Sequence, residues 1–285
     1  MGLAKLAVFL EMIKFEHTVF ALPFAYTGAL LAEQRLPSFH DFVWITLAMV
    51  GARTAAMSLN RIIDRYIDAA NPRTAARALP RGLLPLGTVW LYTAFSLLLL
   101  AVSAYNLSPL AFRLFPVAVI ALTLYSYTKR FTWLCHLFLG GTLALAPLGA
   151  WVAITGSADA AALALAAAVT VWVAGFDIIY ACDDYDFDRT AGIYSIPARF
   201  GIAAGLRVAK VFHVVAAGLF ALCGHMLGLG VFYWLGVAAA ALLLFWQHRL
   251  ISPADLSRAG VAFFNLNGSL SVAMLTAVIA EVVLR

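Results

Sequence analysis

Long apolar stretches alternate with short polar segments along almost the whole of the 285-residue chain. About 20 predominantly apolar residues are enough for a helix to cross a lipid bilayer. Nine stretches approach or reach that length, near residues 15–32, 41–60, 86–105, 110–127, 134–154, 160–181, 207–227, 229–246 and 262–284. The segments between them are short except for two, at about 61–85 and 182–206. The pattern predicts an all-α integral membrane protein of about nine transmembrane helices, with residues 1–285 forming a single polytopic domain.

The composition indicates the same class of protein. Hydrophobic residues make up 64% of the chain and charged residues only 12%, whereas soluble domains carry about 25% charged residues. If the N-terminus is cytoplasmic, fifteen of the 19 lysines and arginines lie on the cytoplasmic side. Three (Arg35, Arg113 and Arg285) lie on the other side, and Arg53 falls within a span. This bias predicts that both longer segments face the cytoplasm from the inner membrane.

The same charge distribution argues against nucleic acid as a partner. The basic residues gather at a membrane surface among carboxylates, so the expected surroundings are the lipid bilayer. The sequence therefore directs attention to the polar residues of the two longer segments.

Two acidic motifs stand at the ends of apolar stretches, where ionisable residues are rare and usually functional. The first runs from Asn60 to Asp68 and the second from Tyr180 to Asp188. Asp64 and Asp68 are four residues apart, as are Asp184 and Asp188, so each pair would share one face of a helix. A hydrogen-bonding residue, Asn60 or Tyr180, precedes each pair by four positions. The repetition predicts that these four aspartates are catalytic and hold divalent cations.

The register of the second motif stays open at this point, because Asp183 and Asp186 offer alternatives to Asp184 and Asp188. We favour the latter pair because it aligns with the first motif behind a polar leader. Paired carboxylates are hard oxygen ligands and suit Mg²⁺ bridged to a substrate phosphate.

Basic residues accompany the acidic motifs on the same predicted side of the membrane. Arg73, Arg77 and Arg81 recur every four residues, and Lys129 follows Tyr125 by four. Planar guanidinium groups and a lysine charge could grip diphosphate oxygens. The predicted substrate-binding residues are Lys14, Asn60, Arg61, Arg77, Tyr125, Lys129 and Tyr180.

This set of residues suits the departure of a diphosphate. Mg²⁺ held by carboxylates, with arginine and lysine around it, stabilises the charge that develops on the leaving group. If the diphosphate is esterified to a polyisoprenoid, its departure leaves an allylic cation, which aromatic faces can stabilise. The lipid tail would explain a site in the membrane, and the cation would need an electron-rich acceptor such as a phenolic ring.

These residues resemble the UbiA-type family of intramembrane prenyltransferases. The first motif of the family matches Asn60, Asp64 and Asp68, the second matches Asp184 and Asp188, and its Tyr-x-x-x-Lys element matches Tyr125 and Lys129. The resemblance to the family's sequences continues over Asn71–Gly82 and Ser195–Gly201. The chain departs from the pattern at Arg61, where many members carry aspartate. This puts a cation beside the predicted metals.

The resemblance implies helices bundled around a central cavity and capped by two cytoplasmic loops. It also implies Mg²⁺, a polyprenyl diphosphate donor and an aromatic carboxylate acceptor, as in the 4-hydroxybenzoate polyprenyltransferase branch of quinone biosynthesis. Related members act on a dihydroxynaphthoate in menaquinone synthesis, so the acceptor stays open, as do donor chain length and oligomeric state. By this resemblance, Lys14 meets the acceptor carboxylate or the diphosphate.

A secondary transporter is the main alternative. The doubled acidic motif would also fit such a protein, because secondary transporters are built from two duplicated halves and bury carboxylates. Transporters place coupling residues near the bilayer midplane, whereas these acids cluster at one face beside basic segments. The sequence therefore favours an enzyme.

Overall fold

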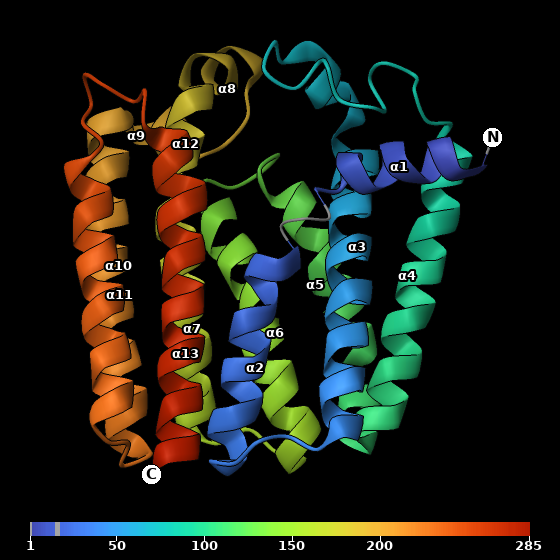
Figure 1. The fold of residues 1–285 in the computed structure, drawn as a ribbon. Coiled ribbons are helices and arrows are strands. Elements are labelled where there is room, and N and C mark those ends of the chain that lie inside the picture. The colour runs from blue at the N-terminus through green and yellow to red at the C-terminus, as the bar shows by residue number, and fades with distance from the viewer. Residues whose placement is uncertain (1, 15–17) are drawn as a thin grey trace.

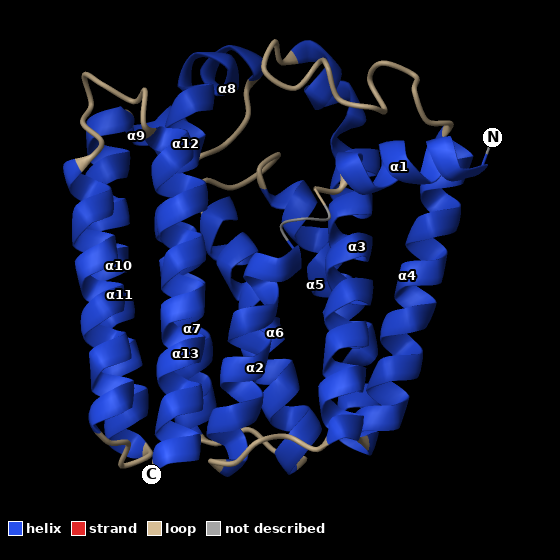
Figure 2. Ribbon diagram, viewed as in Figure 1, coloured by secondary structure: helices blue, strands red, loops and turns tan. Residues whose placement is uncertain are grey.

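The computed structural model describes residues 2–14 and 18–285, and its regular structure over these ranges is helical apart from one isolated bridge between Ser252 and Asp255 (Figure 2). The long helices are α2 (Thr18–Glu33), α3 (Phe39–Ala70), α4 (Leu86–Leu107), α5 (Pro109–Thr128), α6 (Cys135–Thr155), α7 (Ala160–Ala181), α10 (Ile202–Met226), α11 (Val231–Arg249) and α13 (Asn267–Leu284). The shorter ones are α1 (Gly2–Met12), η2 (Cys182–Asp184), α8 (Tyr185–Ala191), α9 (Ile196–Phe200), α12 (Ala259–Val261) and η3 (Ala262–Leu266).

The bundle of membrane helices agrees with the sequence pattern. Within the described residues, eight helical segments are long and apolar enough to cross a membrane. The helix α2 has only 16 residues, but it packs against α6 and α13 in the same bundle. The prediction of an all-α bundle of about nine membrane helices is confirmed, with α2 as its shortest member. The first predicted span began at residue 15, and residues 15–17 lie outside the described residues.

Two helices extend further toward the acidic motifs than predicted. Rather than stopping near residue 60, α3 continues to Ala70, because residues 60–71 include no glycine or proline. Its end is closed by Asn71, whose backbone N–H donates to Ile67 O. The first acidic motif therefore lies on a regular helix and not in a loop. Similarly, α10 begins at Ile202, directly after Gly201, whose φ of 89° is strained for other residues.

One end of the bundle carries a cap, which we define as residues 71–85 together with α8 and α9. Figure 1 shows the cap, the N-terminus and the last turns of α3 at this end, which we call the cap end, and the C-terminus at the opposite, far end. The helix α1 was not predicted and lies across the cap end. Its residues Phe9 and Met12, with Ile13 directly after it, are buried against Ile62 and other apolar residues of α3, α4 and residues 71–85.

Close helix packing in the bundle depends on glycines at two crossings. A Cβ at Gly140 on α6 would come within 2.1 Å of Thr170 O on α7. At Gly28 on α2, it would come within 2.2 Å of Pro147 O on α6. Small residues let membrane helices approach at the backbone. These crossings hold α2, α6 and α7 together along one side of the cavity described below.

Candidate active site

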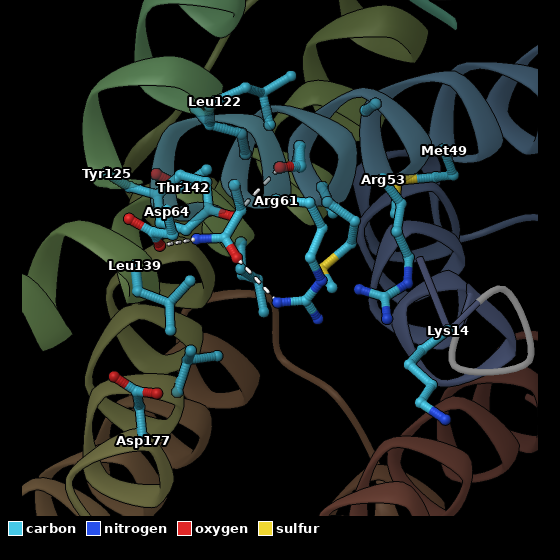
Figure 3. A pocket seen from close by; sticks show the side chains of 18 of the residues that line it. Lys14, Met49, Arg53, Arg61, Asp64, Leu122, Tyr125, Leu139, Thr142 and Asp177 are labelled. Atoms are coloured by element: carbon cyan, nitrogen blue, oxygen red, sulfur yellow. Dashed lines mark hydrogen bonds between the residues drawn. The ribbon is translucent and has the colours of Figure 1, made fainter. Parts of the chain in front are cut away.

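A cavity of about 1330 Å³ runs through the bundle and is lined mainly by α3, α5, α6, α7 and residues 71–85. Most of its charged residues lie at the cap end, where both acidic motifs lie. Figure 3 shows part of this wall, with Asp64, Arg61 and Tyr125 on one side of the cavity and Asp177 on another. All eleven site residues predicted from the sequence line this one cavity: Lys14, Asn60, Arg61, Asp64, Asp68, Arg77, Tyr125, Lys129, Tyr180, Asp184 and Asp188.

Asp64 is almost completely buried, with 1% of its surface exposed. Asn60 Nδ2 donates a 2.8 Å hydrogen bond to Asp64 Oδ2 from one turn earlier on α3. Lys129 Nζ, which lies just after the end of α5, is 2.7 Å from the same oxygen. Arg130 Nη2 is 3.0 Å from Asp64 Oδ1 but directs its hydrogen bond to Ile63 O. The carboxylate is therefore held between two cations from a neighbouring helix end.

Asp68 lies one turn further along α3 and is also buried. Arg77 Nη1 donates a 2.6 Å hydrogen bond to Asp68 Oδ1. Arg61 Nη1 is 3.9 Å from the other oxygen, Oδ2, and donates to Asn60 Oδ1 at 3.3 Å. The cation that replaces the usual family aspartate thus stands between Asn60 and Asp68 and pairs with the motif.

The second motif is not one regular helix. Asp184 ends the 3-10 turn η2, and Asp188 lies on α8. Both aspartates line the cavity, whereas Asp183 and Asp186 are exposed and do not. Ser195 Oγ donates to Asp188 Oδ2 at 3.2 Å. The break lets the chain turn from the end of α7 into the cap while both carboxylates of the predicted register stay on the cavity wall.

An arginine of the cap connects the segment that follows the first motif to the second motif. Arg73 donates two hydrogen bonds to the carboxylate of Asp184 and one to the hydroxyl of Tyr180, whose ring it also covers at 4.7 Å. Asn71 Nδ2 adds a 3.0 Å bond to Asp184 Oδ1. Partial burial alone would lower the pKa of the Arg73 guanidinium, but its bonds with Asp184 and Tyr180 outweigh burial and raise the pKa. Arg73 is therefore permanently charged.

Several contributors to the site had no assigned role in the sequence prediction. Asn71 and Arg130 contact the aspartates directly, and Ser195 holds Asp188. His136 Nδ1 lies 2.7 Å from Asp177 Oδ2, and both residues line the cavity. Arg130 directly follows the predicted residue Lys129, and this adjacency is the sequence signal that could have identified it. The contacts of Asn71 and His136 depend on how distant segments pack, whereas Ser195 meets Asp188 across the short turn between α8 and α9.

The carboxylates fit an oxygen-preferring cation that also binds a ligand. Asp64 Oδ1 and Asp68 Oδ2 are buried oxygens without a hydrogen bond. Among the described residues, no three histidine, cysteine or acidic side chains are close enough to hold a metal by themselves. Mg²⁺ usually binds through one or two carboxylates and completes its shell with water and substrate phosphates. The donor set therefore fits Mg²⁺ brought together with a phosphorylated substrate.

Comparison with known proteins gives a consistent result. The model of the UbiA prenyltransferase family matches residues 21–269. The 4-hydroxybenzoate octaprenyltransferase of Shewanella halifaxensis is 32% identical over 254 residues, which cover 87% of this chain and 83% of the relative. That of Shewanella woodyi is 29% identical over 272 residues, covering 92% of this chain and 93% of the relative. These relatives are enzymes that transfer a prenyl group, and none of these matches is to a transporter.

Solved structures share the fold. The apo structure of a UbiA homolog from Aeropyrum pernix K1 is 36% identical, with a TM-score of 0.86 over 93% of this chain and 98% of that one. A UbiA homolog from Archaeoglobus fulgidus bound to DMAPP and Mg²⁺ has a TM-score of 0.70 at 19% identity, over 94% of this chain and 99% of that one. The second likeness shows the fold alone.

Proposed function

Because the chain belongs to the UbiA prenyltransferase family, we propose that it transfers a polyprenyl group from a polyprenyl diphosphate to an aromatic carboxylate acceptor in quinone biosynthesis. One observation carries the proposal: both acid pairs and their arginines and lysines meet at the cap end of a cavity whose remaining wall is largely apolar. A polar head and a long hydrocarbon tail would each find matching surroundings there. The acceptor named for the curated relatives, 4-hydroxybenzoate, is the first to test.

The two acid pairs are the proposed metal ligands. Asp64 and Asp68 would hold Mg²⁺ on the α3 side of the cavity, and Asp184 and Asp188 on the side of α7 and α8. When bound, Mg²⁺ neutralises charge on the departing diphosphate. The structures of the Archaeoglobus fulgidus homolog with DMAPP or GPP and Mg²⁺ favour this choice of ion.

The basic residues around the carboxylates would bind the diphosphate. Lys129 and Arg77 already lie within 2.7 Å of motif oxygens, so phosphate oxygens bridged to the same carboxylates would come within their reach. Arg73 would add a permanently charged, forked donor from the cap. As the carbon–oxygen bond breaks, these cations would retain the diphosphate. The rings of Tyr125 and Tyr180, which line the cavity, would be available to stabilise the forming allylic cation.

The acceptor would bind deeper in the cavity than the diphosphate. Arg53 and Lys14 lie on the same side of the cavity, across from Asp177 (Figure 3). Two cations there suit the carboxylate of a hydroxybenzoate, because charged donors to a carboxylate form the stronger class of hydrogen bond. Such a pose would turn the phenolic ring toward the diphosphate carbon. Lys14 thus serves the acceptor in this proposal, the first of its two predicted roles.

The orientation in the membrane follows from charge. We propose that the cap end faces the cytoplasm, since the excess of lysine and arginine lies at this end. Residues 1–285 would work as one polytopic unit in the inner membrane, because residues from α3, α5, α7 and the cap all contribute to one cavity.

Product analysis tests the proposed reaction. The purified chain in lipid nanodiscs is incubated with Mg²⁺, a polyprenyl diphosphate and either 4-hydroxybenzoate or 1,4-dihydroxy-2-naphthoate, and the lipid extract is analysed by mass spectrometry. The expected result is a prenylated hydroxybenzoate together with released diphosphate. Absence of any prenylated aromatic product with both acceptors, from protein that melts cooperatively, would contradict the proposal.

A further inference from the structure

The cavity extends well beyond the region that holds the charged groups. Its wall includes Ile45 near the start of α3, Leu107 at the end of α4, Ala111 at the start of α5 and Ala153 near the end of α6. Between Ile45 and Asp64, α3 rises about 28 Å at 1.5 Å per residue. The lining contributed by α4, and by α5 before Tyr125, is uncharged and apolar. The cavity therefore runs from the cap end through most of the depth of the bundle.

Gly149 on α6 stands in the wall of this apolar part. A Cβ built at Gly149 meets no atom within 4 Å, and the residue is exposed. Gly140 on the same helix differs, because a Cβ there would collide with Thr170 O. Helix packing thus requires glycine at position 140 but not at position 149. Position 149 thus lies on the cavity wall with space around it that no protein atom fills.

We propose that Gly149 keeps the apolar part of the cavity open for the tail of the donor, and that it thereby sets which prenyl chain lengths are accepted. This rests on the proposed function, since it assumes that the tail starts at the acid motifs. From the cap end of α6 at Cys135 to Gly149, the helix rises about 21 Å. A geranyl chain with bonds of about 1.5 Å spans at most about 11 Å and would end before Gly149. An octaprenyl chain has a contour length of about 45 Å on the same basis and, when extended along the cavity, would pass Gly149.

The test replaces Gly149 by Ala, Leu and Phe and compares two donors, geranyl diphosphate and octaprenyl diphosphate. Gly141→Phe is the matched control. Gly141 lies on the same helix, and a Cβ built there also meets nothing within 4 Å. It lines a neighbouring groove between α5 and α6 and not the cavity. The measured quantity is the ratio of kcat/KM for the octaprenyl donor to kcat/KM for the geranyl donor, in nanodiscs with saturating acceptor.

The ratio should fall stepwise from Ala to Leu to Phe at position 149, by about tenfold or more for the large side chains, since one misfitting methylene already costs about that much. Geranyl transfer should remain near the wild-type rate, which also shows that the variants are folded, and Gly141→Phe should leave the ratio unchanged. An unchanged ratio across the series would overturn the role of Gly149, as would an equal fall in Gly141→Phe. If Gly149→Phe does not fold, the same ratio of kcat/KM values is measured for the Ala and Leu variants, and their result tests the proposal. Failure of the wild-type chain to convert either donor would count instead against the proposed function.

Discussion

Lys129 Nζ lies 2.7 Å from Asp64 Oδ2, so that a cation at the end of α5 meets a buried carboxylate of α3. The two residues belong to motifs that are separated by more than 60 positions in the sequence, and both line the cavity. A carboxylate that binds metal and a lysine that binds phosphate would be expected side by side at a diphosphate site. The contact therefore favours metal binding by Asp64 and diphosphate binding by Lys129.

Lys129 and Arg77 should serve the donor diphosphate and not the aromatic acceptor. Losing a charged hydrogen bond costs about 1.5–3 kcal/mol, or roughly ten- to a hundredfold in kcat/KM. Lys129→Ala and Arg77→Ala should lower kcat/KM for the donor by this amount and leave the KM of the acceptor unchanged. Steady-state kinetics with each substrate varied in turn measure both quantities.

Lys210→Ala is the matched control for this prediction. Lys210 is an exposed lysine on the early turns of α10 and does not line the cavity. Its loss should leave both kinetic constants at wild-type values. A rise in the acceptor KM with an intact donor KM, in either the Lys129 or the Arg77 variant, would assign that residue to the acceptor pocket instead.

Each carboxylate of the two motifs should be essential. Asp64→Asn, Asp68→Asn, Asp184→Asn and Asp188→Asn keep the shape of the side chain but remove its charge. Each should reduce the rate by more than the roughly 10- to 100-fold cost of altering a neighbour of a metal ligand. Excess chelator should abolish turnover of the wild-type chain, and added Mg²⁺ should restore it.

The second motif provides its own controls, since Asp183 and Asp186 are exposed and lie off the cavity wall. Asp183→Asn and Asp186→Asn should retain near wild-type rates. Full activity in Asp184→Asn or Asp188→Asn, combined with loss in either control, would show that the register is wrong.

The spacing of residues could predict much of this site because the relevant contacts are local to a helix. Asn60, Asp64 and Asp68 are spaced for one face of a helix, and α3 presents all three to the cavity. The apolar stretches similarly predicted the long helices, and the largest change was at α3, which a polar segment continues to Ala70. Regular periodicity carries this information without any knowledge of tertiary structure.

Other features depend on the packing of distant segments and could not be read from periodicity. Arg73 reaches Asp184 across more than 100 positions, and Asn71 bonds the same carboxylate. The 3-10 turn before α8 is a short irregularity with no separate sequence signal. The N-terminal helix α1 lacks a strong start signal and is stabilised by burial of Phe9 and Met12 against other segments.

The cap should face the cytoplasm. After replacement of Cys135, Cys182 and Cys223, a single cysteine introduced at Ala191 in the cap should react with an impermeant maleimide only in inverted membrane vesicles. Ser157→Cys, in the exposed turn between α6 and α7 at the far end, should react only in intact spheroplasts. The opposite pattern for the two positions would reverse the orientation inferred from charge.

The crossing of α6 and α7 should tolerate no side chain at Gly140. A Cβ at this position would lie 2.1 Å from Thr170 O, far inside contact distance, so Gly140→Ala must push the two helices apart. Overpacking of this kind typically costs about 1–3 kcal/mol, and the variant should melt at a lower temperature in detergent. Gly141→Ala is the matched control, because its Cβ meets nothing within 4 Å. In a helix, alanine is favoured over glycine by roughly 0.5–1 kcal/mol, so Gly141→Ala should melt at the wild-type temperature or above it. Equal Tm values for the two variants would mean that the helices can separate at Gly140 without loss, and that the close approach of α6 to α7 does not stabilise the cavity wall.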